Sequence, residues 1–219
     1  MITMAWLEQA AFVAILGLAL VFRPWLPLRH APLQSPWIGA MVLLPFAWWT
    51  QHLLPSGLTL HLSGACLMVL MVGWPLAMWS IAAIAFVADW AAVGALPTWA
   101  NHVSHALWMG LLPGTLALGL GLLIRRWLPS HLFVYILGRG FFTTALSVSA
   151  VGVLAWGAGL VPPALGAEEW LLGHWLLGWG EAISTGMLTA IFVAFKPEWM
   201  LTYSDARYLP PPERPNTPG

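Results

Sequence analysis

Long apolar stretches alternate with short breaks of charge, proline and glycine along most of the chain. A hydrocarbon core about 30 Å thick requires about 20 residues of helix, and about 17–25 are tolerated. Stretches of about this length lie at residues 5–22, 37–54, 58–73, 75–94, 101–124, 139–160 and 170–195. The pattern therefore predicts an all-α, polytopic integral membrane protein with seven transmembrane helices.

The third stretch is the shortest, and Pro55-Ser56-Gly57 and Gly73-Trp74-Pro75 flank it. It could be a re-entrant segment instead of a full span. The positive residues decide between these alternatives, because cytoplasmic connections are enriched in Lys and Arg. With seven spans all 8 Lys and Arg residues lie on one side, whereas six spans place Arg23 and Arg29 opposite the rest. We therefore predict seven crossings, with the N-terminus outside and the C-terminus in the cytoplasm.

The composition agrees with a membrane protein. Of the 219 residues 60% are hydrophobic and 7% charged, against about 45–50% and about 25% in soluble proteins. This excludes a soluble enzyme core. Acidic and basic residues are equal in number, so no basic field is available to bind nucleic acid. We predict a membrane body at residues 1–196, surrounded by lipid of the inner (plasma) membrane, and a short Pro-rich cytoplasmic tail at 197–219.

The common catalytic signatures are missing from the sequence. The single lysine, Lys196, is followed by Pro197, so the chain has no phosphate-binding loop of the Gly-x-x-x-x-Gly-Lys type. There is no Gly-x-Ser-x-Gly elbow, no His-Glu-x-x-His helix and no Cys-x-x-Cys pair. We predict that the protein is not an enzyme and has no covalently bound cofactor.

Five of the 7 histidines lie on the predicted outer side, at the span ends: His52, His61, His102, His105 and His174. Neutral imidazole is a common ligand of nickel, cobalt, copper and zinc. His102 and His105 are three residues apart and therefore share a helix face. The pattern predicts an outward-facing pocket for a transition-metal ion. Alternatively, each imidazole lies in the membrane interface and bonds to headgroups or water.

Three further residues are candidates for this pocket. Asp89 lies in the outer half of its span, where a carboxylate is costly unless it is paired or bound to metal. Asn101 is four residues before His105 and either adds a polar group to that face or caps the helix. Cys66 lies deeper than His61 and is either a small packing residue or a metal ligand.

Glu181 lies near the middle of the last predicted span. An ionised side chain at that depth costs at least about 2.5–3.5 kcal/mol, so it should face the protein interior. We expect a structural hydrogen-bonding role, with Ser184, Thr185 or a helix end of a neighbour as the partner. A coupling role, in which Glu181 relays a conformational change, is the alternative.

Three stretches of the sequence resemble the CbiM/NikM type of energy-coupling-factor permease, the substrate-binding S-components for cobalt and nickel uptake. They are His61-Leu62-Ser63-Gly64-Ala65, residues 100–110 with the core Asn101-His102-Val103-Ser104-His105, and Gly180-Glu181-Ala182-Ile183-Ser184-Thr185-Gly186-Met187 followed by Lys196-Pro197-Glu198-Trp199. The resemblance implies a seven-helix fold with an outer N-terminus. It also implies a second membrane subunit and ATPases as partners.

In that family the N-terminal amine, a histidine at position two and the histidine of the third span hold the metal. His61 corresponds to the last of these, but this chain has Ile2 in place of the histidine. The square-planar site of the relatives therefore does not form as such. The resemblance leaves His52, His102 and His105 as the best-placed replacements, or implies a different substrate.

The leading prediction is a membrane substrate-binding subunit for uptake of a divalent transition-metal ion, cobalt or nickel, through a His-lined outer pocket. Ala82, Ala83, Ala85 and Gly110 are candidates for the surface that contacts a coupling subunit, because small residues allow close helix approach. One alternative is a solitary S-component for cobalamin, with Cys66 as a cobalt ligand. Another is a non-transporting metal-sensing or assembly protein that acts through its tail.

Overall fold

The computed structural model describes residues 2–50, 62–163 and 165–209. In this part of the chain the regular elements are all helical, in agreement with the predicted class. The α-helices are α1 Ile2–Val21, α2 Ala31–Trp49, α3 Ala65–Val72, α4 Trp74–Val93, α5 Trp99–Ala106, α6 Leu112–Trp127, α7 Thr143–Gly157, α8 Ala167–Phe195 and α9 Asp205–Tyr208. Two π-helical segments join them, Leu107–Leu111 before α6 and Val134–Phe142 before α7, and 3-10 turns lie at Pro27–Arg29 and Pro197–Trp199.

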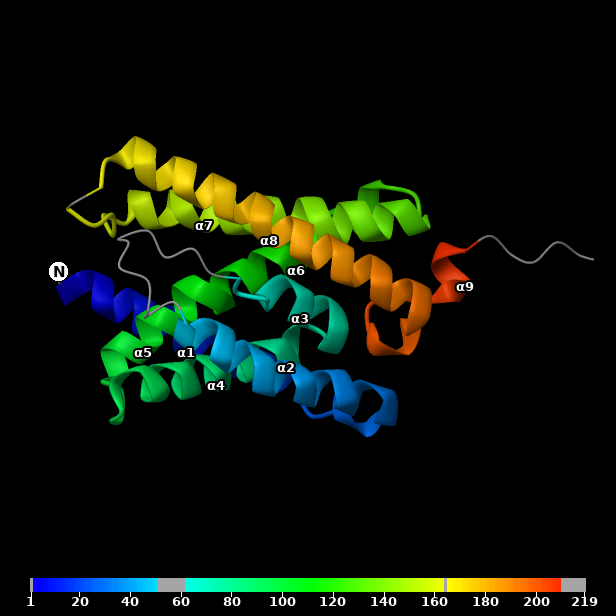
Figure 1. The fold of residues 1–219 in the computed structure, drawn as a ribbon, viewed down its shortest axis with the longest axis horizontal. Coiled ribbons are helices and arrows are strands. Elements are labelled where there is room, and N and C mark those ends of the chain that lie inside the picture. Colours follow the sequence, from blue (N-terminus) through cyan, green and yellow to red (C-terminus); the bar gives the residue numbers. More distant parts are fainter. Residues whose placement is uncertain (1, 51–61, 164, 210–219) are drawn as a thin grey trace, which may run out of the picture.

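The long helices lie roughly along one axis, some running one way along it and some the other (Figure 1). The start of α1, the end of α4, the start of α5 and the α7–α8 connection lie at the left end in that view. The α1–α2 connection, the end of α6, the end of α8 and α9 lie toward the right. The positive residues of the described part belong to segments at this second end: Arg23, Arg29, Arg125, Arg126, Arg139, Lys196 and Arg207. We call it the cation-rich end.

Five helical stretches of the described chain are long and apolar enough to cross a membrane. Each overlaps one of the predicted spans. They are Met4–Val21, Trp74–Val93, Trp99–Trp127, Val134–Gly157 and Ala167–Phe195. The sequence prediction of a polytopic helical membrane protein is confirmed at this level.

The second and third predicted spans differ from the helices observed. The second begins at Ala31 instead of residue 37, because Pro32 lies in the first turn of α2, where its missing N–H costs nothing. A helix over 58–73 is wrong for residues 62–64, since Gly64 adopts a left-handed φ of 66° and α3 begins only at Ala65. The 8 residues of α3 extend about 12 Å. This is less than half of the hydrocarbon thickness.

The beginning of the predicted tail packs on the membrane body. The Leu201 N–H donates to the Met71 carbonyl at 2.9 Å, and the Thr202 hydroxyl donates to the Leu70 carbonyl at 2.8 Å. Met200 is 2% exposed and Tyr208 5%. These hydrogen bonds give donors to the last carbonyl groups of α3, which lack donors within their own helix. Residues 210–219 lie outside the described part.

The surface proposed from small residues for a coupling subunit is mostly interior. Ala82, Ala85 and Gly110 are buried, and of the four only Ala83 is exposed. A Cβ at Gly110 would lie 2.3 Å from Ile81 and 3.1 Å from the Trp48 ring. Ala82, Ala85 and Gly110 therefore serve packing within the chain.

Glycines determine how closely α7 and α8 approach each other. A Cβ at Gly178 would lie 2.8 Å from the Ala145 carbonyl oxygen, which is backbone, and 2.7 Å from the Ser149 hydroxyl. On the same helix Gly180 has no such neighbour within 4 Å. We expect Gly178→Ala to destabilise the protein by about 1–3 kcal/mol through overpacking, and Gly180→Ala to be neutral or stabilising through its higher helix propensity. Thermal unfolding followed by circular dichroism in detergent measures both, and equal melting temperatures would contradict the packing described.

Candidate metal centre

One carboxyl group joins two imidazoles between α4 and α5. Asp89 Oδ2 lies 3.2 Å from His102 Nδ1, and Asp89 Oδ1 lies 2.5 Å from His105 Nδ1. Asp89 is 8% exposed and His102 7% exposed. The spacing of three residues on α5 places both rings on the face toward α4. Three of the predicted site residues are thus brought together.

Aromatic rings enclose this cluster. The His102 ring contacts Phe12, Phe86 and Trp99, with centroid distances of 5.9, 5.7 and 6.4 Å. The His105 ring lies 5.2 Å from the Trp48 ring. An apolar surrounding strengthens the electrostatic contacts inside it. The cluster lies near the left end in Figure 1, where α4 ends and α5 begins, opposite the cation-rich end.

The contact through Nδ1 determines what each imidazole offers. When Nδ1 carries the proton and donates it to Asp89, the Nε2 atom keeps its lone pair for a metal ion. A carboxylate behind a metal-binding histidine is a common arrangement that orients the ring. Within residues 2–50, 62–163 and 165–209, no three His, Cys, Asp or Glu side chains form a group that could hold a metal ion. His52 and His61, predicted as further ligands, lie outside the described residues.

Glu181 binds the segment that leads into α3. Its carboxyl oxygens accept hydrogen bonds from the Ser63 hydroxyl at 2.8 Å, the Ser63 N–H at 3.2 Å and the Gly64 N–H at 3.1 Å. Glu181 is 1% exposed. The left-handed Gly64 turns both N–H groups toward α8, and the acceptor comes from the middle of that helix. The carboxyl group therefore satisfies buried donors at the start of a neighbouring helix.

Trp48 connects this segment with the imidazole pair. The indole N–H of this fully buried residue donates to the Ser63 carbonyl at 3.0 Å, and its ring faces His105. A chain of contacts thus runs from Glu181 through Ser63 and Trp48 to His105. Ser63 is two residues after His61 in the sequence.

The other predicted site residues lie elsewhere. Cys66 is 1% exposed, and its thiol lies 3.9 Å from the Pro113 carbonyl oxygen. Asn101 is exposed on the first turn of α5, and Thr98, not Asn101, is the residue that precedes the helix. His174 of α8 contacts the Trp170 carbonyl of its own helix at 3.1 Å.

Three residues near the site were not predicted. Trp48 and Ser63 connect Glu181 with the imidazole pair. Glu8 of α1 accepts hydrogen bonds from the Trp108 indole N–H at 2.8 Å and from the Ser104 hydroxyl at 3.5 Å. Glu8 had a detectable signal, since it is an acidic residue inside the first apolar stretch. Trp48 had none, because the chain has 16 Trp residues, and many are expected at the membrane interface.

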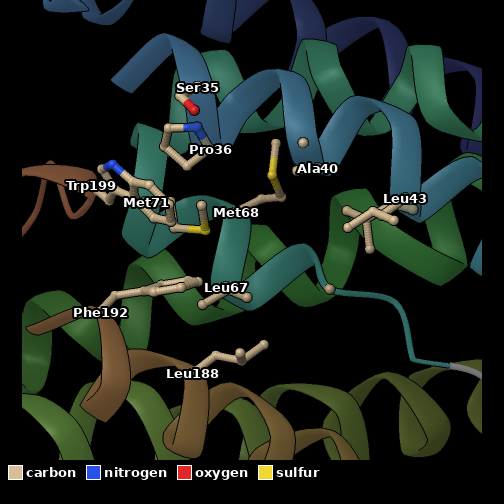
Figure 2. A pocket seen from close by; sticks show the side chains of 13 residues that line it. Ser35, Pro36, Ala40, Leu43, Leu67, Met68, Met71, Leu188, Phe192 and Trp199 are labelled. Atoms are coloured by element: carbon tan, nitrogen blue, oxygen red, sulfur yellow. The ribbon is translucent and has the colours of Figure 1, made fainter. Parts of the chain in front are cut away.

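A large apolar groove lies away from these polar groups. It has a volume of about 450 Å³ and lies between α2, α3 and the end of α8, where Leu43, Met68, Leu188 and Phe192 line it (Figure 2). Its lining contains no acidic residue, histidine or cysteine. The groove therefore offers no strong ligand to a metal ion, and the polar cluster near α5 is the better candidate.

The fold and the site together define a polytopic helical membrane protein with a buried carboxyl–imidazole cluster near one end. A family model described as the cobalt uptake substrate-specific transmembrane region, CbiM, matches residues 1–199, and the chain belongs to this family. The resemblance found in the sequence is thereby confirmed. The family is one of transporters, which is consistent with a protein that is not an enzyme and whose substrate is a metal ion. No curated protein and no solved structure matches the chain.

Proposed function

We propose that this protein is the substrate-binding membrane subunit for uptake of a divalent transition-metal ion, cobalt or nickel, across the inner membrane. The observation that carries the proposal is Asp89 joining His102 and His105 at the end opposite the positive residues. Membership of a cobalt-uptake family supports the class of substrate. In this proposal the imidazoles bind the ion through Nε2, and Asp89 orients them. His61 and His52 complete the set of ligands.

The proposed topology has seven crossings, with the N-terminus outside and the C-terminus in the cytoplasm. Support comes from α2 and α4, which run in the same direction (Figure 1), because two parallel spans require one crossing between them. In the proposed topology α3 belongs to this third crossing. The side with the positive residues is then cytoplasmic, and the imidazole pair faces outward.

The proposal includes a coupling subunit and ATPases as partners, which the resembled permeases require. The chain supplies no ATP-binding motif of its own. The cobalamin alternative would use Cys66 as a ligand, but the geometry does not favour it, because that thiol is buried against the Pro113 carbonyl. The tail-signalling alternative gains no support from a tail whose first part is packed on α3.

Elemental analysis of the full chain purified without chelator tests the proposal. We expect cobalt or nickel to copurify with the protein. Calorimetric titration with Co²⁺ then compares the wild type with His61→Ala and His102→Ala, and we expect each substitution to weaken binding by at least about tenfold, because each removes a proposed ligand. His30→Ala is the control, because His30 lies at the cation-rich end in the α1–α2 connection. Unchanged affinity in both site variants would overturn the proposed pocket.

A further inference from the structure

Three arginines from three different elements line one cavity at the cation-rich end. They are Arg125 of α6, Arg139 of the π-helical segment before α7, and Arg207 of α9. The cavity has a volume of about 690 Å³, and Ser204 and Tyr208 also line it. These groups all donate hydrogen bonds, and a guanidinium binds the oxygens of a phosphate through two parallel N–H groups.

No carboxylate neutralises these arginines in the described part of the chain. The only Lys or Arg ion pair there is Lys196 with Glu198. Arg139 donates long hydrogen bonds to the Thr202 carbonyl at 3.4 Å and the Tyr208 hydroxyl at 3.5 Å, its guanidinium lies 5.4 Å from the Tyr135 ring centroid, and its Nε is buried without a hydrogen-bond partner. Three positive charges directed at one cavity repel one another unless an anion joins them. The arginine N–H groups at this cavity therefore outnumber the acceptors that the protein offers them.

The other wall of the cavity is apolar. Leu118 and Leu122 line it, and both lie on α6, seven and three residues before Arg125, which places the three on one helix face. From Arg125 to Leu118 the helix rises about 10 Å toward the interior of the bilayer. Leu122 is 53% exposed. The cavity thus continues from a basic mouth into an apolar surface at membrane depth.

We propose that this cavity binds the phosphate headgroup of an anionic phospholipid. Arg125, Arg139 and Arg207 bind the phosphate, and an acyl chain lies along Leu122 and Leu118. Basic pockets between transmembrane helices on the cytoplasmic side are typical sites for anionic lipid headgroups. A free phosphate ion would use the basic part alone and leave the leucine wall without a ligand. The inference rests on residues remote from the imidazole pair and does not depend on the metal proposal.

The neighbouring residue Arg126 is a control that separates binding at this cavity from a general effect of positive charge at the cation-rich end. Its guanidinium lies 5.9 Å from the Trp127 ring centroid, and it does not line the cavity. Arg125 and Arg126 are both exposed and adjacent on the same helix. Replacing either one removes the same charge at the same membrane depth, so only the specific site separates their effects.

The test uses the full chain in a neutral detergent and native mass spectrometry with added lipid. We expect phosphatidylglycerol to remain bound in preference to phosphatidylcholine by about tenfold, the size of a charge-assisted contact of about 1.4 kcal/mol. The double variant Arg125→Gln/Arg207→Gln should lose this preference, whereas Arg126→Gln should keep it. Both replaced arginines are exposed, so an unchanged circular dichroism spectrum is expected to show that the variants are folded.

Inorganic phosphate is added in a separate arm to distinguish a lipid from a free anion. Competition by millimolar phosphate that fully displaces phosphatidylglycerol would overturn the lipid assignment. Equal retention of both lipids by the wild type, or equal losses in Arg126→Gln and the double variant, would overturn the site itself. Loss of the preference in the double variant alone supports the proposal.

Discussion

Replacing Glu181 by alanine should destabilise the protein and weaken cobalt binding together. The carboxyl group accepts three hydrogen bonds from Ser63 and Gly64, and Glu181 itself is only 1% exposed. Each buried donor left without an acceptor costs about 1–3 kcal/mol. The same contacts constrain the chain two residues after His61, so we expect cobalt affinity to fall by up to about 100-fold, as for substitutions behind a metal ligand.

Thermal unfolding in detergent and Co²⁺ calorimetry on the full chain measure these two effects. Glu168→Ala is the matched control, because Glu168 is an exposed acidic residue in the first turn of the same helix. Glu181→Gln keeps one carbonyl acceptor and should lie between the wild type and Glu181→Ala. A melting temperature of Glu181→Ala equal to that of the control would show that the contacts contribute nothing to stability.

Replacing Asp89 by alanine is the second large effect we expect. Both His102 and His105 direct Nδ1 at this carboxyl group. Without it both rings lose a contact that orients them and that holds the proton on Nδ1. The loss should exceed that of His102→Ala, because two imidazoles are affected, and cobalt affinity should fall by up to about 100-fold. Asp205→Ala, at the exposed start of α9, is the control.

A double-mutant cycle separates orientation of the imidazoles from direct metal binding by Asp89. If Asp89 acts only through the rings, Asp89→Ala should have no further effect on Co²⁺ affinity in a His102→Ala/His105→Ala background. An additional loss of the same size in that background would identify Asp89 as a metal ligand. Melting temperatures of all four proteins show whether any difference arises from unfolding instead.

Much of the fold could be predicted because the bilayer imposes strict requirements. Every backbone group at membrane depth must be hydrogen-bonded, so long apolar stretches form helices. Five such stretches are helices of sufficient length. The third stretch shows the limit of this reasoning. Its apolar residues gave no indication that Gly64 adopts a left-handed conformation, which delays the start of α3 to Ala65.

The sequence alone also placed Asp89, His102 and His105 on candidate surfaces, because three-residue spacing and an unusual carboxylate are local properties. It did not determine which groups meet. Helices with apolar residues on all sides carry little information on their rotation about the axis. The sequence therefore did not determine which side chains of different helices contact each other.

Family and helical class were determined by the sequence, since both depend on the order of residues along the chain. The tertiary structure decided that Glu181 meets Ser63, 118 residues away, and that arginines of three elements share one cavity. Such contacts depend on the depth and rotation at which helices pack. These are set by the glycines and buried polar groups between helices, not by the apolar pattern of any one of them.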